Sequence, residues 1–515
     1  MRYSKLKSCT IIGLNPHLID VEVDHDKRSI IHDIDIVGLG DTAVKESKKR
    51  IKSAVRNSGY DLPTGKMVVN LAPGDLRKEG SLLDLPIALG IMRTVGIIKR
   101  DMSKVFAIGE LGLDGSVKPV KGVLPILLYL KEKKMFDLKV LIPKGNENEV
   151  FMTEGLEIYS VENLIDTITF LNGDTVKEPL KPIEVDSTRR EDYELDFSEV
   201  KGQLMARRAA EIAAAGMHNL LMKGPPGSGK SMIARRIPTI LPPMTEKEML
   251  EVTKIYSVVG LVDEKNPIVT RRPFRSPHHT SSAVSIIGGG NDPKPGEISL
   301  AHNGILFLDE LPEFRRDVLE ALRQPMEDGE VTISRARMSV TYPASFMFVG
   351  AQNPCPCGHF GDPKIQCRCT PYDIYRYNKK ISGPILDRID VFVELRSIEY
   401  EEYRSRVQSE SSREIRMRVM RAWEMQKDRF RKEKVNFNSK MNSKQIRKYC
   451  GLTGEAERMF ERGVRSFKLS GRGMDKILKL SRTIADLDGV ERIDSTHVAE
   501  AFQFRHRPME EILSI

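Results

Sequence analysis

At residues 224–231 the chain has the sequence Gly224-Pro225-Pro226-Gly227-Ser228-Gly229-Lys230-Ser231, which matches G-x-x-x-x-G-K-[ST] at every position. The apolar run Leu220-Leu221-Met222 precedes it and predicts a buried strand, and a helix is expected after Ser231. In that context backbone N–H groups close around phosphates, Lys230 can reach the β- and γ-phosphates, and Ser231 can hold Mg²⁺. The stretch therefore predicts a phosphate loop, with all eight residues binding ATP.

Two carboxylates, Asp309 and Glu310, follow a second apolar run, Ile305-Leu306-Phe307-Leu308. The run predicts a buried parallel strand, and its C-terminal end is where open α/β sheets bind ligands. Asp309 can hold Mg²⁺, and Glu310 can orient or deprotonate an attacking water. The alternative is a buried strand that ends in a solvated acidic turn. Beside an intact phosphate loop, the pair predicts a Mg²⁺-dependent ATPase with an α/β core.

The composition bounds the class of protein. A chain of 515 residues is expected to hold two to four domains. A net charge of +9 permits a polyanionic partner but also fits a merely solvated surface. The chain has no apolar run long enough for a transmembrane helix and no signal-peptide pattern at its N-terminus. We therefore expect a cytoplasmic protein without a membrane partner, whose cysteines are reduced.

Four segments follow one another along the chain. Residues 1–172 alternate short β-branched runs with helical stretches, which predicts an α+β domain. Residues 173–196 are polar and contain proline, as linkers do. Residues 197–396 form the expected ATPase core, and residues 397–515 are helical in pattern and form the expected lid.

The first segment resembles the proteolytic domain of Lon-type proteases. The resemblance rests on Gly74-Asp-Leu-Arg-Lys-Glu-Gly-Ser-Leu-Leu-Asp84 and on Gly109-Glu-Leu-Gly-Leu-Asp-Gly115. The catalytic serine and lysine of that family fall on Leu82 and on or near Leu124 in this chain. Because a dyad needs a hydroxyl and an amine, we expect a Lon-like domain that has lost its catalytic pair and serves docking or assembly.

The core resembles AAA+ ATPases. Residues 197–203 precede a predicted helix and then the phosphate-loop strand, and a later strand, Phe346-Met347-Phe348-Val349, leads to Asn353. The resemblance implies that this strand lies between the two motif strands and that Asn353 senses the γ-phosphate or holds the attacking water. The alternative for Asn353 is a turn residue before proline.

Two arginines complete the site that the resemblance implies. Arg388 matches the arginine that reaches a neighbouring subunit's γ-phosphate, which implies an oligomeric ring. Arg482 matches the lid arginine that contacts the nucleotide. The alternatives are a salt bridge of Arg388 with Asp387 or Asp390, and a solvated helix face for Arg482.

The whole set of motifs resembles the magnesium-chelatase-like AAA+ proteins, and within them the ComM/YifB group. The resemblance implies a hexameric ATPase that binds single-stranded or branched DNA and promotes branch migration in homologous recombination and natural transformation. The further matching pieces are Ser276-Pro-His-His-Thr-Ser281, Ala301-His-Asn-Gly304, Asn353-Pro-Cys-Pro-Cys357 and Arg482-Thr-Ile-Ala-Asp-Leu487. Rival functions are the motor subunit of a metal chelatase and an ATP-dependent protease or remodelling factor.

Three basic segments are candidates for DNA contact. They are Arg271-Arg-Pro-Phe-Arg-Ser-Pro-His-His279, the alternating hairpin pattern Val331 to Val340, and the helix predicted over 413–434. Lysine and arginine neutralise phosphates without reading sequence, so binding there is expected to be salt-sensitive. A structural hairpin and a solvated helix face are the alternatives.

Four of the six cysteines cluster with C-x-C-x₉-C-x-C spacing, at Cys355, Cys357, Cys367 and Cys369. Four thiolates suit tetrahedral Zn²⁺, which would pin the loop 353–370. Reduced thiols in a turn-rich loop are the alternative.

Overall fold

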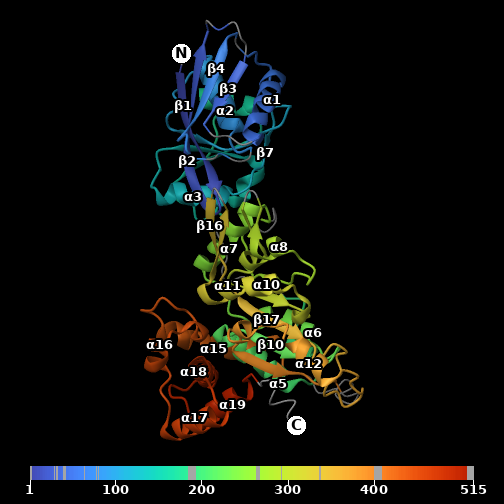
Figure 1. Cartoon of the computed structure of the whole chain (residues 1–515). Coiled ribbons are helices and arrows are strands. Elements are labelled where there is room, and N and C mark those ends of the chain that lie inside the picture. Colours follow the sequence, from blue (N-terminus) through green and yellow to red (C-terminus); the bar gives the residue numbers. More distant parts are fainter. Residues whose placement is uncertain are drawn as a thin grey trace. The chain divides into compact units, whose positions relative to one another are not determined.

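The chain forms two compact units in the computed structural model (Figure 1). Unit 1 comprises residues 1–188 and 249–269, and unit 2 comprises residues 189–248 and 270–515. The structure describes residues 3–27, 29, 33–38, 42–62, 64–76, 78, 81–183, 193–262, 267–290, 293–335, 338–398 and 409–506. The ATPase core expected at 197–396 is thus interrupted, because residues 249–269 within it group with unit 1.

Unit 1 is built on a seven-stranded mixed sheet with the order β3-β4-β2-β1-β5-β8-β9. The strands are β1 (Tyr3–Ile12), β2 (Asn15–Asp26), β3 (Asp33–Val37), β4 (Lys66–Ala72), β5 (Val105–Ala107), β8 (Lys139–Pro143) and β9 (Glu157–Val161), and β6 (Glu110–Leu111) pairs with β7 (Val117–Lys118). The helices are α1 (Thr42–Asn57), α2 (Asp84–Thr94), α3 (Val123–Glu132) and α4 (Leu164–Asn172), with the 3₁₀ turn η1 (Lys144–Glu149). The predicted α+β class is confirmed.

Side-chain alternation along the strands places apolar residues on both faces of this sheet. In β8, Val140 and Ile142 pack into one buried cluster with residues of α3, such as Ile126. Leu141, between them, packs into a second cluster with residues of α2, such as Leu89. Because successive side chains of a strand point to opposite faces, helices cover both sides.

Unit 2 contains a five-stranded parallel sheet with the order β11-β14-β17-β10-β18. Its strands are β10 (Leu220–Lys223), β11 (Phe274–Arg275), β14 (Ile305–Leu308), β17 (Met347–Gln352) and β18 (Val391–Glu394), and two hairpins are β12 (Gly288–Gly289)–β13 (Lys294–Pro295) and β15 (Glu330–Arg335)–β16 (Met338–Pro343). The helices of the core are α5 (Leu204–Gly216), α6 (Lys230–Ile240), α8 (Ala283–Ile287), α9 (Glu297–Leu300), α10 (Arg316–Ala321), α11 (Arg323–Asp328), α12 (Pro371–Asn378) and α13 (Gly383–Leu386), and α7 (Glu246–Val259) crosses from unit 2 into unit 1. The short 3₁₀ turns are η2 (Phe197–Glu199) and η3 (Leu311–Glu313).

The order of strands brings three motif-bearing strand ends to one edge. Strand β17 lies between β10 and β14, with Lys223 opposite Gln352 and Leu308 opposite Gly350. All three strands are parallel, so their carboxyl ends meet where α/β sheets bind ligands. The predicted arrangement, with the third strand between the two motif strands, is present, and the α/β class of the core is confirmed.

The C-terminal helices form the orange and red group of unit 2 in Figure 1. They are α15 (Ser412–Arg429), α16 (Ser443–Tyr449), α17 (Gly454–Ser466), α18 (Gly471–Leu487) and α19 (Ser495–Gln503), with the 3₁₀ turn η4 (Asn438–Lys440). In α18 the apolar residues Ile477, Leu480 and Ile484 recur at helical spacing and are buried in the core cluster of unit 2. Residues 399–408 and 507–515 of the expected lid lie outside the described part of the chain.

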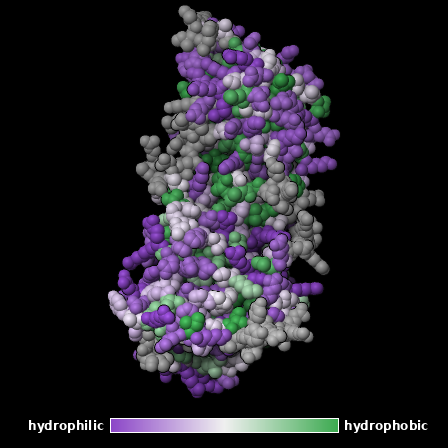
Figure 2. All heavy atoms as spheres, turned by 90° about the vertical axis from the view of Figure 1, so that its right-hand side faces the viewer, coloured by the Kyte–Doolittle hydropathy of each residue, from purple (hydrophilic) through white to green (hydrophobic). Residues whose placement is uncertain are grey.

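The face drawn in Figure 2 carries mostly hydrophilic side chains, with hydrophobic ones in smaller groups between them. This agrees with a composition in which 30% of residues are charged. Among the described residues, no helix combines the length and the hydropathy that crossing a membrane requires.

Candidate active site

The phosphate loop joins β10 to α6, as its pattern predicts. Gly227 and Gly229 adopt left-handed φ values of 74° and 90°, which glycine reaches without strain. The Nζ atom of Lys230 is buried and donates to the carbonyl oxygens of Gly224 at 2.7 Å and Pro225 at 2.8 Å. Burial lowers the pKa of Lys230, while the charges of Asp309 and Glu310 oppose that shift. A bound phosphate would offer this ammonium a stronger, charged acceptor than a carbonyl.

Ser231 and Asp309 meet at the first turn of α6. The Oγ atom of Ser231 donates to Oδ2 of Asp309 at 2.6 Å, across 78 positions of sequence. A hydroxyl and a carboxylate are the hard oxygen ligands that Mg²⁺ takes beside substrate phosphates. The donor set fits Mg²⁺, which would supply charge neutralisation of the phosphates.

Glu310 is exposed and occupies a left-handed conformation with φ of 51°. This conformation is unusual for a residue other than glycine and marks a turn that re-aims the side chain. Its Oε2 atom lies 3.2 Å from Nδ1 of His279. His279 lies in the turn after β11, the strand that pairs with β14 in the sheet. Our sequence reasoning missed this partner, because nothing in the spacing of residues 279 and 310 indicates contact.

Asn353 lies one residue beyond β17, and its Oδ1 atom is 3.3 Å from Nζ of Lys230. Asn353 is therefore at the phosphate loop, a position that is also compatible with the alternative of a turn residue before proline. A polar side chain in this position can hold a water molecule or a γ-phosphate oxygen.

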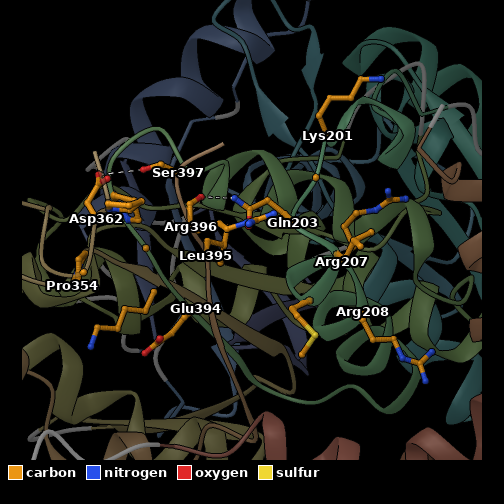
Figure 3. Close-up of a pocket in the computed structure, with 18 of the residues that line it drawn as sticks. Lys201, Gln203, Arg207, Arg208, Pro354, Asp362, Glu394, Leu395, Arg396 and Ser397 are labelled. Carbon is orange, nitrogen blue, oxygen red and sulfur yellow. Dashed lines mark hydrogen bonds between the residues drawn. The ribbon is translucent and has the colours of Figure 1, made fainter. Parts of the chain in front are cut away.

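A cavity of about 1100 Å³ opens beside the phosphate loop (Figure 3). Gln203 lies in its wall and donates from Nε2 to the carbonyl oxygens of Ser228 at 3.1 Å and Arg396 at 2.6 Å. Gly224 and Pro225 also line it, so the cavity is continuous with the phosphate loop. Its size is sufficient for the nucleoside part of a nucleotide. The sequence pointed to Gln203 only through the segment 197–203 that precedes the helix.

Comparisons with known proteins match the chain to one family. A family model described as magnesium chelatase, subunit ChlI, covers residues 196–403, and its C-terminal counterpart covers residues 409–505. Competence protein ComM of Haemophilus influenzae is 41% identical over 477 residues, 91% of each chain. YifB of Escherichia coli is 40% identical over 508 residues, 98% of this chain and 97% of that one. The chain belongs to the ComM/YifB-type magnesium-chelatase-like AAA+ family. The predicted family is confirmed, and the protein is an AAA+ ATPase of the ComM group.

The chelatases themselves are more distant relatives. The magnesium-chelatase 38 kDa subunit of Cereibacter sphaeroides is 25% identical over 174 residues, only 31% of this chain. A further family model, described as subunit ChlI of magnesium chelatase, matches residues 21–146 of unit 1. The presence of unit 1 therefore does not distinguish this family from the chelatases. The share of the chain that is matched does: 91% for ComM and 31% for the chelatase subunit.

In this AAA+ core, Arg388 follows α13 and is turned toward its own subunit. Its guanidinium forms an ion pair with Glu327 and donates from Nη1 to the carbonyl oxygen of Pro384 at 2.8 Å. The Asp390 carboxylate instead lies 3.4 Å from Nδ1 of His218. The intramolecular partner is thus Glu327 of α11, not the Asp387 or Asp390 considered from sequence. The fold places α11 beside Arg388, although 61 positions separate the two residues. A contact in trans requires Arg388 to leave Glu327.

Arg482 is turned into the lid rather than toward solvent. Its side chain is 1% exposed, and Nε lies 3.1 Å from Oδ1 of Asp486, one helical turn away. The guanidinium also donates to the backbone carbonyls of Val490 and Glu491. With these partners, the structure does not bring Arg482 to the phosphate loop, and the alternative of a solvated face is wrong as well. Its contacts stabilise the end of α18.

Some basic residues of the segments considered for DNA contact form ion pairs within the protein. Arg272 is buried and paired with Glu248 at 3.2 Å, and Arg275 is paired with Glu297 at 2.6 Å. Residues 336–337, between β15 and β16, lie outside the described part of the chain. The helix predicted over 413–434 ends at Arg429, so α15 carries the exposed Arg413, Arg421 and Lys427, and the exposed Arg431, Lys432 and Lys434 follow its end.

The expected hairpin between 331 and 340 is present as β15 and β16. Val331 and Val340 are buried, whereas Thr332 and Thr341 face each other across the exposed side at 2.9 Å. The alternation predicted from sequence thus produces one packed face and one hydroxyl-bearing face.

The four clustered cysteines come together, and their sulfur atoms all lie within 4.8 Å of one another. The backbone N–H groups of Arg368 and His359 lower the pKa of Cys357, whereas desolvation raises the pKa of Cys367 and of Cys369. Cys9 and Cys450 are buried elsewhere as single thiols.

In unit 1, the positions that correspond to a protease dyad are apolar. Leu124 is buried at the start of α3, and Leu82 packs against the hydrophobic cluster on that face of the sheet. Neither side chain can donate or accept a proton. The environment is a packed core rather than a hydrolytic site.

Proposed function

We propose that this protein is an ATP-dependent DNA translocase or helicase that works as a hexameric ring and promotes branch migration in homologous recombination and natural transformation. The observation that carries the ATPase part is the pair of contacts from the phosphate loop, Lys230 with Asn353 and Ser231 with Asp309. The DNA part is supported by the ComM relative, whose name assigns it to competence and which this chain matches over 91% of its length.

The chemistry follows from the residues at the edge of the sheet. Lys230 and the backbone N–H groups of the phosphate loop bind the nucleotide phosphates, and Ser231 and Asp309 hold Mg²⁺. Glu310 activates the water that attacks the γ-phosphate, and Asn353 positions it. Arg388 of a neighbouring subunit stabilises the charge that develops in the transition state, which requires a closed ring. Zn²⁺ in the cysteine cluster completes the proposed cofactor set, and we place the protein in the cytoplasm.

Two rival functions share the same ATPase centre. A chelatase motor would act on a tetrapyrrole-binding partner, and the sequence match to curated chelatases covers about a third of the chain. An ATP-dependent protease would need a nucleophile in unit 1, where Leu82 and Leu124 are apolar. Both observations favour the DNA translocase.

The deciding experiment is ATP hydrolysis with and without single-stranded and forked DNA. Strong stimulation by DNA that disappears in Glu310→Gln supports the proposal, because this variant keeps the nucleotide site and loses the base. Hydrolysis that no DNA changes contradicts it. Metallation of a porphyrin or degradation of casein in the same preparation would instead favour the chelatase or the protease.

A further inference from the structure

We propose that Cys355, Cys357, Cys367 and Cys369 hold one Zn²⁺ ion, and that this zinc-held loop is a wall of the nucleotide cavity whose loss weakens nucleotide binding. The zinc site stands on its own geometry. Its coupling to the nucleotide rests on the ATPase function proposed above.

Three of the sulfur atoms are spaced close to what a tetrahedral ion requires, and all four lie within 4.8 Å of one another. Sγ of Cys355 lies 3.3 Å from Sγ of Cys357 and 3.7 Å from Sγ of Cys367, and Cys357 and Cys367 are 3.6 Å apart. Four thiolates at about 2.3 Å from Zn²⁺ lie about 3.8 Å from one another in a tetrahedron. These distances exclude disulfides, whose sulfurs are about 2.05 Å apart. A complete set of four thiolates leaves no open coordination position, so the site is structural rather than catalytic.

The backbone of the loop also supports metal-bound thiolates. The N–H of Phe360 donates to Sγ of Cys355 at 3.3 Å, and the N–H of Cys369 donates to Sγ of Cys367 at 3.4 Å. Such donors stabilise sulfur charge and orient the ligands.

The cysteine loop packs closely against the phosphate loop at Gly358. This glycine has a φ of 85°, and a Cβ atom there would lie 2.6 Å from Cδ of Pro226. The N–H of Gly358 bonds to the carbonyl of Cys355 at 3.0 Å, so the turn that contacts Pro226 is part of the cysteine cluster. A residue with a side chain would push the two loops apart.

The same loop lines the cavity on one side (Figure 3). Pro354 and residues 360–363 contribute to the lining, together with Gln203 and Leu395 from other parts of the chain. Asp362 accepts from Oγ of Ser397 at 3.2 Å, which ties the loop to the segment after β18. The wall therefore connects the end of β17 with the end of β18.

Besides the cysteines, scattered polar contacts hold this loop, such as those of Asp362 with Ser397 and of Lys364 Nζ with the carbonyl oxygen of Ile398. The described residues 353–370 contain no helix or strand, and 361 and 363–366 are exposed. Ordering such a segment costs about 1–2 kcal/mol of backbone entropy per residue, which metal binding can offset. Without zinc, we expect the loop to lose its conformation and the cavity to lose its wall, while Lys230 at the start of α6 and Asp309 after β14 keep their places.

The first test is the metal content of the full-length protein, purified without chelator and measured by mass spectrometry. We expect about one zinc per chain. The double variant Cys367→Ser/Cys369→Ser is expected to lose it, whereas Cys450→Ala, which removes a cysteine in the lid, is expected to keep it. A wild-type protein that contains no zinc and takes up none with its thiols reduced would overturn the site.

The second test is binding of a fluorescent ADP analogue to the same proteins. The double variant is expected to bind at least about threefold more weakly than wild type, and Cys450→Ala equally well. Gly358→Ala is expected to keep zinc and still bind more weakly, because its methyl group meets Pro226. Unchanged affinity in the zinc-free variant overturns the coupling. A zinc-loaded wild type that binds no nucleotide overturns the proposed ATPase and the coupling with it, and leaves the zinc site standing.

Discussion

Nζ of Lys230 lies 3.3 Å from Oδ1 of Asn353, although 123 positions separate the two residues. The contact exists because β17 is the neighbour of β10 in the sheet, so the ends of both strands reach the same edge. In this structure Lys230 therefore contacts the phosphate-loop carbonyls and the candidate sensor at once. A nucleotide phosphate would enter between groups that are already assembled.

Replacement of Lys230 by alanine is expected to abolish measurable ATP hydrolysis and to weaken nucleotide binding by at least about tenfold, because the ammonium that donates to the phosphate-loop carbonyls is lost. Titration with a fluorescent nucleotide measures the binding. Lys444→Ala, at an exposed position near the start of α16, serves as the matched control and should behave as wild type. Equal affinity in the Lys230→Ala protein would contradict the assignment.

Asn353→Ala is expected to lower kcat by about 10- to 100-fold with little change in nucleotide affinity, since a positioning group acts on the attacking water rather than on the bound phosphates. Steady-state hydrolysis and equilibrium binding separate the two effects. A loss of affinity with kcat unchanged would show that Asn353 only supports the phosphate loop.

Arg388→Ala is expected to abolish hydrolysis while each subunit still binds nucleotide, because the arginine would act on a neighbour's γ-phosphate. Mixing Arg388→Ala with Lys230→Ala subunits tests this directly. Some interfaces of the mixed ring then combine an intact phosphate loop with an intact Arg388, so partial activity should return. Mixtures that remain inactive, in rings shown to be mixed, count against action in trans.

Arg482→Ala is expected to destabilise unit 2 by about 3–5 kcal/mol, because it leaves the carboxylate of Asp486 buried with fewer partners. Arg429, paired with Asp486 at 2.7 Å, would compensate in part. Denaturant unfolding measures the change, with the exposed Arg462→Ala as control. A variant with unchanged stability and weak nucleotide binding would instead support the nucleotide contact that the family resemblance implies for Arg482.

Asp390 is expected to contribute a pH-dependent part of stability. Its burial opposes ionisation, but hydrogen bonding and charge from His218 outweigh burial, with help from Lys476 and Lys479, and hold the pKa below its usual range. The unfolded chain then binds the proton more tightly, so the stabilisation is present above about pH 4 and is lost as pH falls through the folded-state pKa. Urea unfolding between pH 3 and 7 should show a shallower acid decline for Asp390→Asn. Parallel curves for the two proteins would refute this contribution.

Much of the fold and of the candidate site could be predicted because the informative patterns are local. The eight residues of the phosphate loop and the pair Asp309–Glu310 each sit in a strand–turn context that short stretches of sequence specify. Spacing alone also indicated the cysteine cluster. The partner of Glu310 could not be predicted, since His279 reaches it from the turn that follows another strand, β11.

The amino-acid sequence by itself determined the chemistry that this protein carries: a phosphate loop, two carboxylates after a buried strand, a polar residue after a third strand, and four thiols. Tertiary packing alone decided where side chains point and what they meet. It turned Arg482 into the lid, paired Arg388 with Glu327, and set Gly358 against Pro226. The physical reason is that motif and periodicity depend on neighbours along the chain. Burial and ion pairing depend instead on residues that only the folded sheet and helices bring together.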